Sequence, residues 1–498
     1  MATNPLKKLL GDTAIYGLSS IIGRFLNYLL VPLYTYKIAA ESGGYGVVTN
    51  IYAYTGLLLV LLTFGMETTF FRFSNKENAN PDKTFSTSAL TVGIVALLFA
   101  TLTTIFLGPI SRALNYADHP EYIEMMAIVV ALDAFQAILF SRLRYKNRPV
   151  KFATLKLLFI VLNIALNLLF IVVAPALKDS YPDLFSWYRF ENQVRYIFVA
   201  NLISTSVVTL GFIPELRLLR LGIDRNLLKP MLKYTWPLLL LGLAGILNQV
   251  ADKICYRFIV PGQEGEVQLG IYGACVKIAM IMALITQAFR YAYEPFVFGS
   301  SKDKKSKETQ AVVMKYFVIF TMTAFLAVMM YLDIFKFIIS KDYWEGLRAI
   351  PIVMMAEVFM GVYFNLSFWY KLSDQTWWGA IFSGIGCAVL IAINFIFVPK
   401  YGYMACAWGG VAGYGICMAL SYIVGQKKAP VPYEAGKIIM YMALAVALYW
   451  ISTFTQVENT ALRLIINTLY IIAFLAVAYF ADLRKVINVN KIINRLKH

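Results

Sequence analysis

Apolar residues occur along the chain in blocks of about twenty, and short polar stretches separate the blocks. A helix of ~20 apolar residues spans the ~30 Å hydrocarbon core of a bilayer, so each block predicts a membrane-spanning helix. The pattern therefore indicates an all-α polytopic membrane protein with about 14 transmembrane helices. Their approximate ranges are 13–35, 45–66, 87–110, 121–142, 151–173, 194–214, 234–260, 268–295, 311–332, 347–370, 377–398, 402–424, 436–453 and 461–481.

The composition agrees with a membrane protein and excludes other classes. Of the 498 residues, 59% are hydrophobic and 15% are charged, whereas soluble domains average ~45–50% and ~25%. A soluble protein with a single core and a disordered chain are both excluded. The cysteines all fall in apolar blocks and form no CxxC pair, so neither a disulfide framework nor a zinc site is expected.

The distribution of charge predicts the orientation of the helices. The chain carries 45 lysines and arginines against 28 acidic residues, which gives a net charge of +17. Cations collect in the cytoplasmic segments of membrane proteins. Most of them fall on one side here if the N-terminus is cytoplasmic, notably in 142–151 and 217–233. An even number of helices then places both termini in the cytoplasm. We expect a bacterial cytoplasmic (inner) membrane protein and no nucleic-acid partner, because the charge reports topology.

The two halves of the chain share short matches that recur in the same order, about 221–227 residues apart. They are Leu26-Asn27 with Leu247-Asn248, Gly46 with Gly270, Tyr145-Lys146 with Tyr370-Lys371, and Asn167 with Asn394. Helices 1–6 (1–220) are therefore expected to repeat as helices 7–12 (221–428), and 429–498 adds two helices and a cytoplasmic tail. Because six is even, this predicts two lobes in a parallel pseudo-two-fold repeat, as in transporters that work by alternating access.

Short motifs also follow one another along both halves. In the first half they are Arg24, Val31-Pro32-Leu33-Tyr34-Thr35, Tyr45-Gly46, Gly65-Met66-Glu67, Phe71-Arg72 and Arg142-x-Arg144. In the second half they are Trp236-Pro237, Asp252-Lys253, Gly270-Ile271-Tyr272, Glu294-Pro295-Phe296 and Pro399-Lys400-Tyr401-Gly402. In their order and spacing the chain resembles flippases of the multidrug/oligosaccharidyl-lipid/polysaccharide (MOP) exporter superfamily, in particular the Wzx-type polysaccharide branch. The resemblance leads us to expect an arginine directly after Asp252. This chain has Lys253 there instead and so departs from the pattern.

The resemblance implies a fold like that of the MATE transporters and a specific function. The protein would move a polyprenyl-diphosphate-linked oligosaccharide repeat unit across the cytoplasmic membrane for surface polysaccharide synthesis, whether O-antigen, capsule or exopolysaccharide. Its partners would be that lipid-linked substrate, membrane lipid and a polymerase of the same pathway. A flippase for the lipid-linked peptidoglycan precursor and a cation-coupled drug antiporter of the same superfamily remain as alternatives.

Charged residues inside predicted spans are candidates for substrate binding, because a charge there is costly and usually faces inward with a partner. Arg24, Asn27 and Tyr28 share one face of the first helix, and an arginine suits phosphate oxygens. An interhelical salt bridge is the alternative role for Arg24. Three more intramembrane cations join Arg24 as candidate lining of one cationic cavity for an anionic head group, namely Lys253, Lys277 and Arg290. The alternative for these three is pairing with acids, above all of Arg290 with Glu294.

Intramembrane carboxylates are candidates for coupling to an ion gradient or for gating. Asp133 and Lys156 are expected at similar depth, either as a structural pair or with Asp133 as a cation-coupling group. Glu67, Glu294 and Glu357 would bind a proton or Na⁺. For Glu67 and Glu294, which lie near cytoplasmic helix ends, gating salt bridges to Arg72 or Arg290 are the alternative. Asp252 belongs to the same set, because it lies next to Lys253.

Enzyme motifs are missing from the sequence. No P-loop GxxxxGK[ST] is present, and both histidines, His119 and His498, lie outside the predicted spans. We therefore expect a transporter that is not an enzyme and has no cofactor or metal, with coupling to an H⁺ or Na⁺ gradient left open. Cations in the cavity argue against a drug–cation antiporter. A membrane glycosyltransferase or polymerase usually has a large outer loop, and no outer loop here exceeds ~20 residues.

Overall fold

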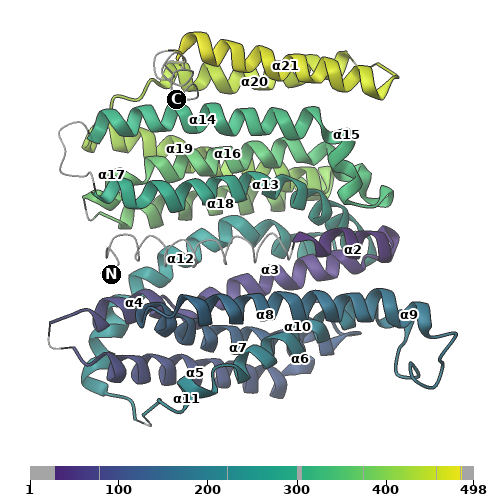
Figure 1. Ribbon diagram of the computed structural model, residues 1–498, viewed down its shortest axis with the longest axis vertical. Helices are drawn as coiled ribbons and strands as arrows, with labels where there is room; N and C mark the ends of the chain where they lie inside the picture. Colours follow the sequence, from purple (N-terminus) through teal and green to yellow (C-terminus); the bar gives the residue numbers. More distant parts are fainter. Residues whose placement is uncertain are drawn as a thin grey trace, which may run out of the picture. The chain divides into compact units, whose positions relative to one another are not determined.

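The computed structural model of the chain describes residues 28–77, 79–220, 222–299, 306–373, 375–455, 457–482 and 484. Every regular element within these ranges is a helix (Figure 1). By length and composition, 13 of the described segments can cross a membrane, and they coincide with every predicted block after the first. The first block, 13–35, lies mostly outside the described residues, which begin near α2 (Leu30–Lys37). The all-α membrane prediction is confirmed.

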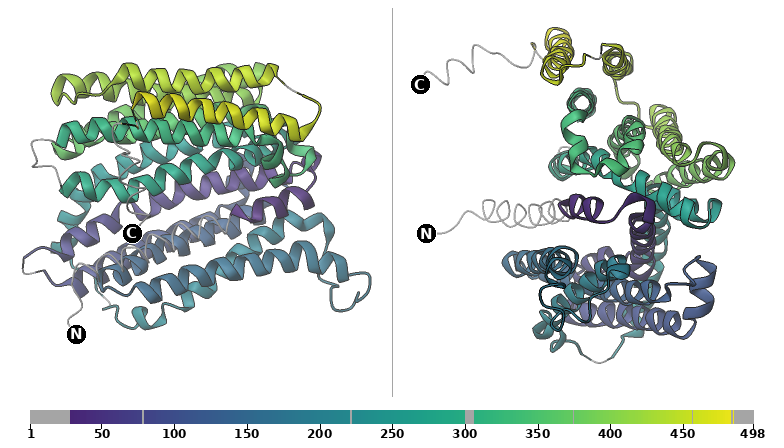
Figure 2. Two further views of the ribbon diagram at one scale, coloured as in Figure 1. Left: turned by 45° about the horizontal axis from the view of Figure 1, so that its top comes forward. Right: turned by 90° about the vertical axis from the view of Figure 1, so that its right-hand side faces the viewer.

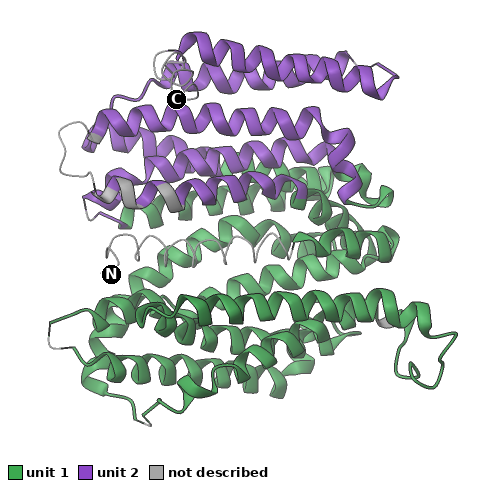
Figure 3. Cartoon of the chain, in the orientation of Figure 1, with its two compact units in different colours: residues 1–277, 339–346, 377–413 green, residues 278–338, 347–376, 414–498 purple. Residues whose placement is uncertain are grey.

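The chain divides into two compact units (Figure 3). Unit 1 contains Met1–Lys277, Ile339–Gly346 and Trp377–Gly413, and unit 2 contains Ile278–Ile338, Leu347–Thr376 and Tyr414–His498. Unit 1 thus combines the first predicted lobe with α12 and α18 from the second. The lobe boundaries at 220 and 428 remain a prediction, since the units divide the chain by compactness rather than by repeat.

Unit 1 is built from long, nearly parallel helices (Figure 2). The helices wholly inside it are α2, α3 (Gly44–Thr63), α4 (Met66–Ser74), α5 (Pro81–Ile105), α6 (Leu107–Ala113), α7 (Pro120–Tyr145), α8 (Pro149–Leu168), α9 (Ala174–Leu177), α10 (Gln193–Leu210), α11 (Ile213–Leu216), α12 (Arg225–Ile259) and α18 (Trp377–Tyr401). The π-helical turn Leu169–Val173 interrupts the helix formed by α8 and α9. Two helices, α13 (Gln263–Gly299) and α19 (Tyr403–Lys428), continue from unit 1 into unit 2.

Unit 2 contains α14 (Ser306–Met330), α15 (Leu332–Phe335), α16 (Ile350–Leu366), α17 (Phe368–Leu372), α20 (Ala435–Phe454) and α21 (Thr460–Ala481). The last two helices lie beside α14 (Figures 1 and 2). The Asn467 amide on α21 donates to the Met330 carbonyl oxygen at 2.6 Å. A buried polar contact of this kind ties neighbouring helices together where no water competes for the hydrogen bond.

Helix starts in unit 1 follow from local sequence. Pro81, Pro120 and Pro149 stand at the first positions of α5, α7 and α8, where a missing N–H costs nothing and the fixed φ suits a helix. The Asp224 carboxylate accepts from the backbone N–H groups of Asn226 and Leu227 and so caps α12. Capping satisfies donors that have no partner within the helix and fixes the residue at which α12 begins.

The core of unit 1 is an apolar cluster between α3, α4, α5, α7, α8, the end of α10 and the start of α12. It includes Phe70, Phe85, Ile138, Phe212 and Met231, all of which are nearly or fully buried. These large apolar side chains come from helices that are far apart in sequence. Their close packing stabilises the arrangement of the helices in unit 1. The core fixes one side of α12, which carries part of the candidate site.

Two glycines that the repeat makes equivalent lie in contact. A Cβ on Gly46 of α3 would lie 1.8 Å from the Glu266 carbonyl oxygen and 3.0 Å from the Gly270 nitrogen, and a Cβ on Gly270 of α13 would lie 3.0 Å from the Gly46 nitrogen. Only glycine permits so close a helix crossing. Equivalent positions touch each other only beside a two-fold axis, so the contact agrees with the predicted parallel repeat.

Candidate functional site

A polar site in unit 1 lies between α12 and the first half of α13. The Lys253 ammonium group on α12 donates to both carboxylate oxygens of Asp252 at 3.0 Å and to the Gln249 carbonyl oxygen at 3.1 Å. The Tyr272 hydroxyl on α13 donates to Asp252 Oδ2 at 2.8 Å. The carboxylate therefore receives two donors from two helices, and it holds Lys253 against the ring of Tyr272, 5.6 Å from the centroid.

Two asparagines position α12 at this depth. The Asn50 amide on α3 donates to the Lys253 carbonyl oxygen at 2.7 Å, and the Asn248 amide donates to the Ser383 carbonyl oxygen on α18 at 2.7 Å. Asn50 in turn accepts from the Tyr116 hydroxyl at 2.8 Å. Buried amide–carbonyl bonds are directional, so α12 is held on one side by α3 and on the other by α18.

Lys277 is the second cation of the site and differs from Lys253 in its surroundings. It is half-buried on α13, one helical turn beyond Gly273 and Ala274. The described residues offer it no ion pair, and the group within electrostatic range is the like-charged Lys253. The Asp252 carboxylate pairs with Lys253, and no carboxylate among the described residues pairs with Lys277. The site carries an excess of positive charge within two membrane-spanning segments, where charge is costly unless a partner supplies the opposite sign.

A second polar cluster at the same end of α12 ties this helix to its neighbours. The Arg257 guanidinium is buried and lies 2.6 Å from a Glu266 carboxylate oxygen on α13. It also donates to the Asn115 carbonyl oxygen at 2.5 Å and stacks on the Tyr116 ring at 3.7 Å. Arg257 follows Lys253 at i,i+4, so both lie on one face of α12. This spacing is the signal in the sequence that the polar face of α12 extends to Arg257.

The remaining predicted substrate ligands lie elsewhere. Arg24 and Asn27 lie outside the described residues, and Tyr28 is half-buried at their edge. Arg290 is in the unit 2 part of α13, with its guanidinium 4.2 Å from the centroid of the Phe364 ring. Among the described candidates of unit 1, the structure brings Lys253 and Lys277 together. That all four cations line one cavity remains a prediction.

Asp133 and Lys156 face each other across α7 and α8 without a direct ion pair. Each lies within electrostatic range of the other, but the Lys156 ammonium lies 4.0 Å above the Phe140 ring instead. Asp133 faces the Thr205 hydroxyl on α10. The Asn201 amide, one turn before Thr205, donates to the Tyr52 hydroxyl at 2.9 Å. Asp133 thus belongs to a polar interior of unit 1 that four helices share.

Several carboxylates have partners other than those considered from sequence. Glu67 accepts from Arg144 at 3.1 Å and from Ser141 at 3.2 Å. Arg72, the partner considered for it, stacks 4.1 Å above the Tyr234 ring. In unit 2, Glu294 pairs with Lys371 at 3.4 Å, and Glu357 is half-buried on α16. The chain brings these partners together from distant segments, so spacing along one helix could not identify them.

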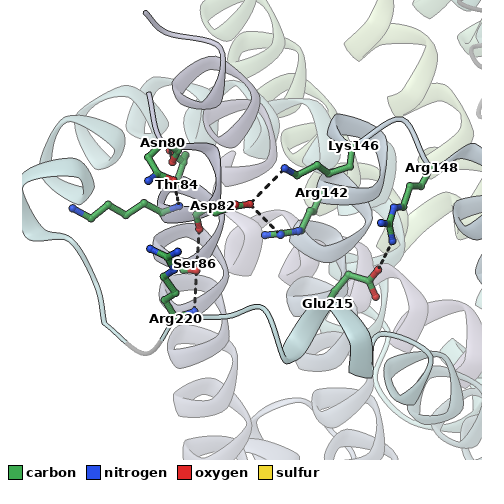
Figure 4. A network of polar contacts seen from close by, with 10 residues as sticks. Asn80, Asp82, Thr84, Ser86, Arg142, Lys146, Arg148, Glu215 and Arg220 are labelled. Carbon is green, nitrogen blue, oxygen red and sulfur yellow. Dashed lines mark hydrogen bonds and ion pairs between the residues drawn. The ribbon is translucent and has the colours of Figure 1, made fainter. Parts of the chain in front are cut away.

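A further polar network at this end of unit 1 includes Asp82 and Glu215 (Figure 4). Asp82 pairs with Arg142 at 3.1 Å and with Lys146 at 3.6 Å. Glu215 pairs with Lys151 at 2.6 Å, and Arg148 lies 4.0 Å from it. The basic loop after α7 is therefore neutralised by acids from α5 and α11. Its cations have a structural role, since these ion pairs hold the helix ends together.

Unit 2 holds a buried ionic cluster that sequence analysis missed. Lys315 on α14 lies 2.5 Å from Glu434 and 2.7 Å from Asp482. Asp482 also accepts from Lys437 and from the Tyr441 hydroxyl, both at 2.8 Å. The acidic partners of Lys315 are more than a hundred residues away in sequence, so only the fold shows that the cluster binds α14 to α20 and α21. We name Lys315, Glu434, Lys437, Tyr441 and Asp482 the anchor cluster.

No group of three or more metal-binding side chains gathers within the described ranges. The expectation of no metal and no cofactor stays a prediction, since this finding concerns only part of the chain. Coupling to H⁺ or Na⁺ does not require such a group.

Comparison with known proteins places the chain in a family. A family model described as "Polysaccharide biosynthesis protein" matches residues 9–291, more than half of the chain. The chain belongs to this family. The matched range covers the site residues of α12 and α13, from Asn248 to Lys277. No curated protein matches the chain in sequence.

Solved structures show the fold of this member of the polysaccharide biosynthesis family. The lipid II flippase MurJ in an inward closed conformation has a TM-score of 0.70 at 14% identity, with 95% of this chain and 99% of that chain covered. An inward-facing multidrug resistance MATE family transporter of the MOP superfamily has a TM-score of 0.64 at 15% identity, with 81% and 93% covered. A MOP superfamily transporter from Pyrococcus furiosus, described as having a binding pocket of reverse polarity, has a TM-score of 0.51 at 15% identity, with 84% and 95% covered.

The family and the fold together support a flippase or transporter in a membrane. The predicted MATE-like fold is confirmed. Family and fold are those of transporters and flippases rather than of enzymes. The printed descriptions name different cargoes for the same fold, so the cargo of this chain has to be argued from its own residues.

Proposed function

We propose that the protein is a flippase that moves a polyprenyl-diphosphate-linked oligosaccharide across the bacterial cytoplasmic membrane by alternating access. The observation that carries the proposal is the excess positive charge at Lys253 and Lys277, because the Asp252 carboxylate pairs with Lys253 while Lys277 has no ion pair among the described residues. A diphosphate supplies the missing negative charge. Charged groups in a low-dielectric interior attract a complementary head group strongly, while the lipid tail remains in the bilayer.

The two lysines have different tasks in this mechanism. Asp252 and Tyr272 hold Lys253, so it provides a fixed positive field. Lys277 has no such fixation within the described residues and is the direct ligand of a phosphate oxygen. A lysine binds phosphate as a point charge through a flexible stem and lacks the planar fork of an arginine. Such a contact forms and breaks readily, which suits a carrier that must release its cargo.

Coupling and sidedness complete the proposal. Asp133, enclosed by helices of unit 1 and facing Thr205 and Lys156, is the group through which an H⁺ or Na⁺ gradient would act, because an intramembrane carboxylate is the usual carrier of such coupling. Both termini lie in the cytoplasm under the positive-inside rule. This orientation places the start of α3, the end of α12 and the start of α13 on the outer side of the membrane. The Arg257–Glu266 pair and the Gly46–Gly270 contact then hold these outer helix ends together. A polymerase of the same pathway would receive the flipped product.

The test is mass spectrometry of polyprenyl-diphosphate lipids in a strain that lacks the protein, together with staining for surface polysaccharide. We expect lipid-linked oligosaccharide to accumulate and surface glycan to disappear. Wild type and Lys37→Ala should restore export, because Lys37 is exposed at the end of α2. Lys277→Ala should not restore it. Export restored by Lys277→Ala would contradict the site, and an unchanged lipid profile would contradict the flippase.

The second candidate is a flippase for the lipid-linked peptidoglycan precursor. The observation that favours it is the similarity to the lipid II flippase MurJ over nearly the full length of both chains. The same mass measurement separates the two, since a peptide-bearing saccharide would accumulate instead. A drug antiporter would show altered sensitivity to cationic drugs with no lipid change, and the cation excess at Lys253 and Lys277 is the wrong charge for that cargo.

A further inference from the structure

One face at the start of α12 carries exposed cations in a regular row. Arg225, Lys229 and Lys233 follow one another at i,i+4 and are all exposed. This spacing places them on one side of the helix, about a turn apart. We name these three residues the α12 cationic row.

The row has no acidic partner among the described residues, unlike the neighbouring cations. Asp224 is the acid next to it in sequence, but Asp224 caps α12 and pairs with Lys83 at 2.7 Å. Asp82 pairs with Arg142 (Figure 4), and Glu215 pairs with Lys151. The cations of the loop after α7 are thus neutralised inside the protein, whereas those of the row are available to an anion outside it.

The same face becomes apolar farther along the helix and remains uncovered. Trp236 is 62% exposed and Leu240 is 45% exposed, and helical geometry places both within the arc of the cationic row. The opposite face carries Met231, which is 0% exposed in the core of unit 1. A face that is cationic at one end and apolar at the other matches a lipid, whose phosphate lies above its acyl chains.

The length of α12 places the row at the level of lipid head groups. Its 35 residues extend over ~52 Å, well beyond the ~30 Å of hydrocarbon. With Trp236 at the interface, where tryptophan concentrates, Lys233 lies ~5 Å and Lys229 ~10 Å farther along the axis. Arg225 lies beyond them, with a long side chain that can bend back toward the phosphates.

We propose that the α12 cationic row, with Trp236 and Leu240, is a binding surface for anionic phospholipids of the adjacent leaflet. Juxtamembrane lysines and arginines are attracted to anionic lipid head groups, and the apolar end of the face accommodates the acyl chains. The surface lies on α12 outside the Asp252–Lys253–Lys277 site. It therefore concerns the membrane around the protein rather than its cargo, and it does not depend on the proposed function.

The experiment uses the full chain purified in detergent and native mass spectrometry of lipid adducts. Phosphatidylglycerol and phosphatidylcholine with the same acyl chains are titrated separately. The wild type should retain phosphatidylglycerol with at least about tenfold higher affinity than phosphatidylcholine. The triple variant Arg225→Gln, Lys229→Gln, Lys233→Gln should lose that preference. The matched variant Lys37→Gln, Arg189→Gln, Lys400→Gln removes the same charge from exposed positions on other helices and loops and should keep it.

Further measurements identify the source of the anion and exclude misfolding of the triple variant as the cause of lost binding. Inorganic phosphate at millimolar concentration should not displace phosphatidylglycerol, because it lacks the acyl chains. The single variants Lys229→Gln and Lys233→Gln should each weaken binding by a few-fold. The proposal fails if the triple variant still prefers phosphatidylglycerol, if the wild type binds both lipids equally, or if phosphate displaces the lipid. It also fails if the matched variant loses the preference as fully as the triple variant.

Discussion

The site on α12 and α13 and the anchor cluster in unit 2 both contain two lysines inside helical packing, but their charges balance differently. In the anchor cluster, Lys315 and Lys437 face Glu434 and Asp482, with Tyr441 as a further donor. In the site, Asp252 pairs with Lys253, and Lys277 has no carboxylate partner among the described residues. The charges of the anchor cluster are paired with one another, whereas the site on α12 and α13 leaves a positive charge without a counterion.

This difference separates structural charges from functional ones. A buried ionic network with all groups paired holds helices together, and breaking it is costly. A buried cation with no acid beside it destabilises the protein unless another molecule supplies the charge. The balance of charge within a cluster is thus more informative than the mere presence of lysine in a span. It predicts opposite outcomes for the same substitution at Lys315 and at Lys277.

The largest effect is expected from Lys315→Met. The substitution leaves the carboxylate of Asp482, which is 3% exposed, with one cation fewer and removes the link from α14 to α20 and α21. Breaking a buried pair costs about 3–5 kcal/mol, and we expect the lower end because Lys437 and Tyr441 remain. Thermal unfolding of the protein in detergent measures the loss. An unchanged Tm would show that the anchor cluster does not hold the unit together.

Lys277→Met should reduce transport without reducing stability, which is the opposite of what we expect for Lys315→Met. Loss of a charged hydrogen bond to a phosphate costs about 1.5–3 kcal/mol, so we expect transport of the lipid-linked oligosaccharide to fall by roughly 10- to 100-fold. The Tm should stay the same or rise, since an unpaired cation has been removed. Flux and unfolding are measured on the same preparation. A fall in Tm with normal flux per folded molecule would assign Lys277 to structure and erase the contrast with Lys315.

Acid should weaken the anchor cluster in a defined window. Burial opposes ionisation of Asp482, but hydrogen bonds from Lys315, Lys437 and Tyr441 outweigh it and hold the pKa of this carboxyl well below its ordinary value of 3.8. A carboxyl whose pKa is depressed by folding stabilises the protein above the unfolded value and loses that contribution as the pH falls below it. The Tm should therefore drop as the pH is lowered below about 4.

The control for this pH dependence is Asp482→Asn, which should start lower in Tm and vary less over the same range. Glu434 contributes in the same direction, because hydrogen bonds from Lys315 and Lys437 lower the pKa of its carboxyl. The Glu434 side chain is 41% exposed, so its share is the smaller one. Equal pH profiles for wild type and Asp482→Asn would assign the acid sensitivity to other carboxylates.

The sequence allowed the fold and part of the site to be predicted, for a physical reason. Membrane spans follow from apolar length alone, so every described span was anticipated. Lys253 and Lys277 stood out because charge is rare at that depth. The pairing of charges could not be foreseen, since Lys315 meets Asp482, and Glu67 meets Arg144, only through the fold.

The smallest effect is expected from Glu434→Gln, and it tests which carboxylate makes the anchor cluster structural. Glu434 accepts from Lys315 and Lys437 but is partly exposed, and exposed ion pairs contribute about 0–1 kcal/mol. Both lysines keep Asp482 as a partner after the substitution. The Tm should fall slightly, by far less than in Lys315→Met. If the two variants lost equal stability, the link between the α19–α20 connection and α14 would be the essential contact, and burial of Asp482 would not explain the strength of the anchor cluster.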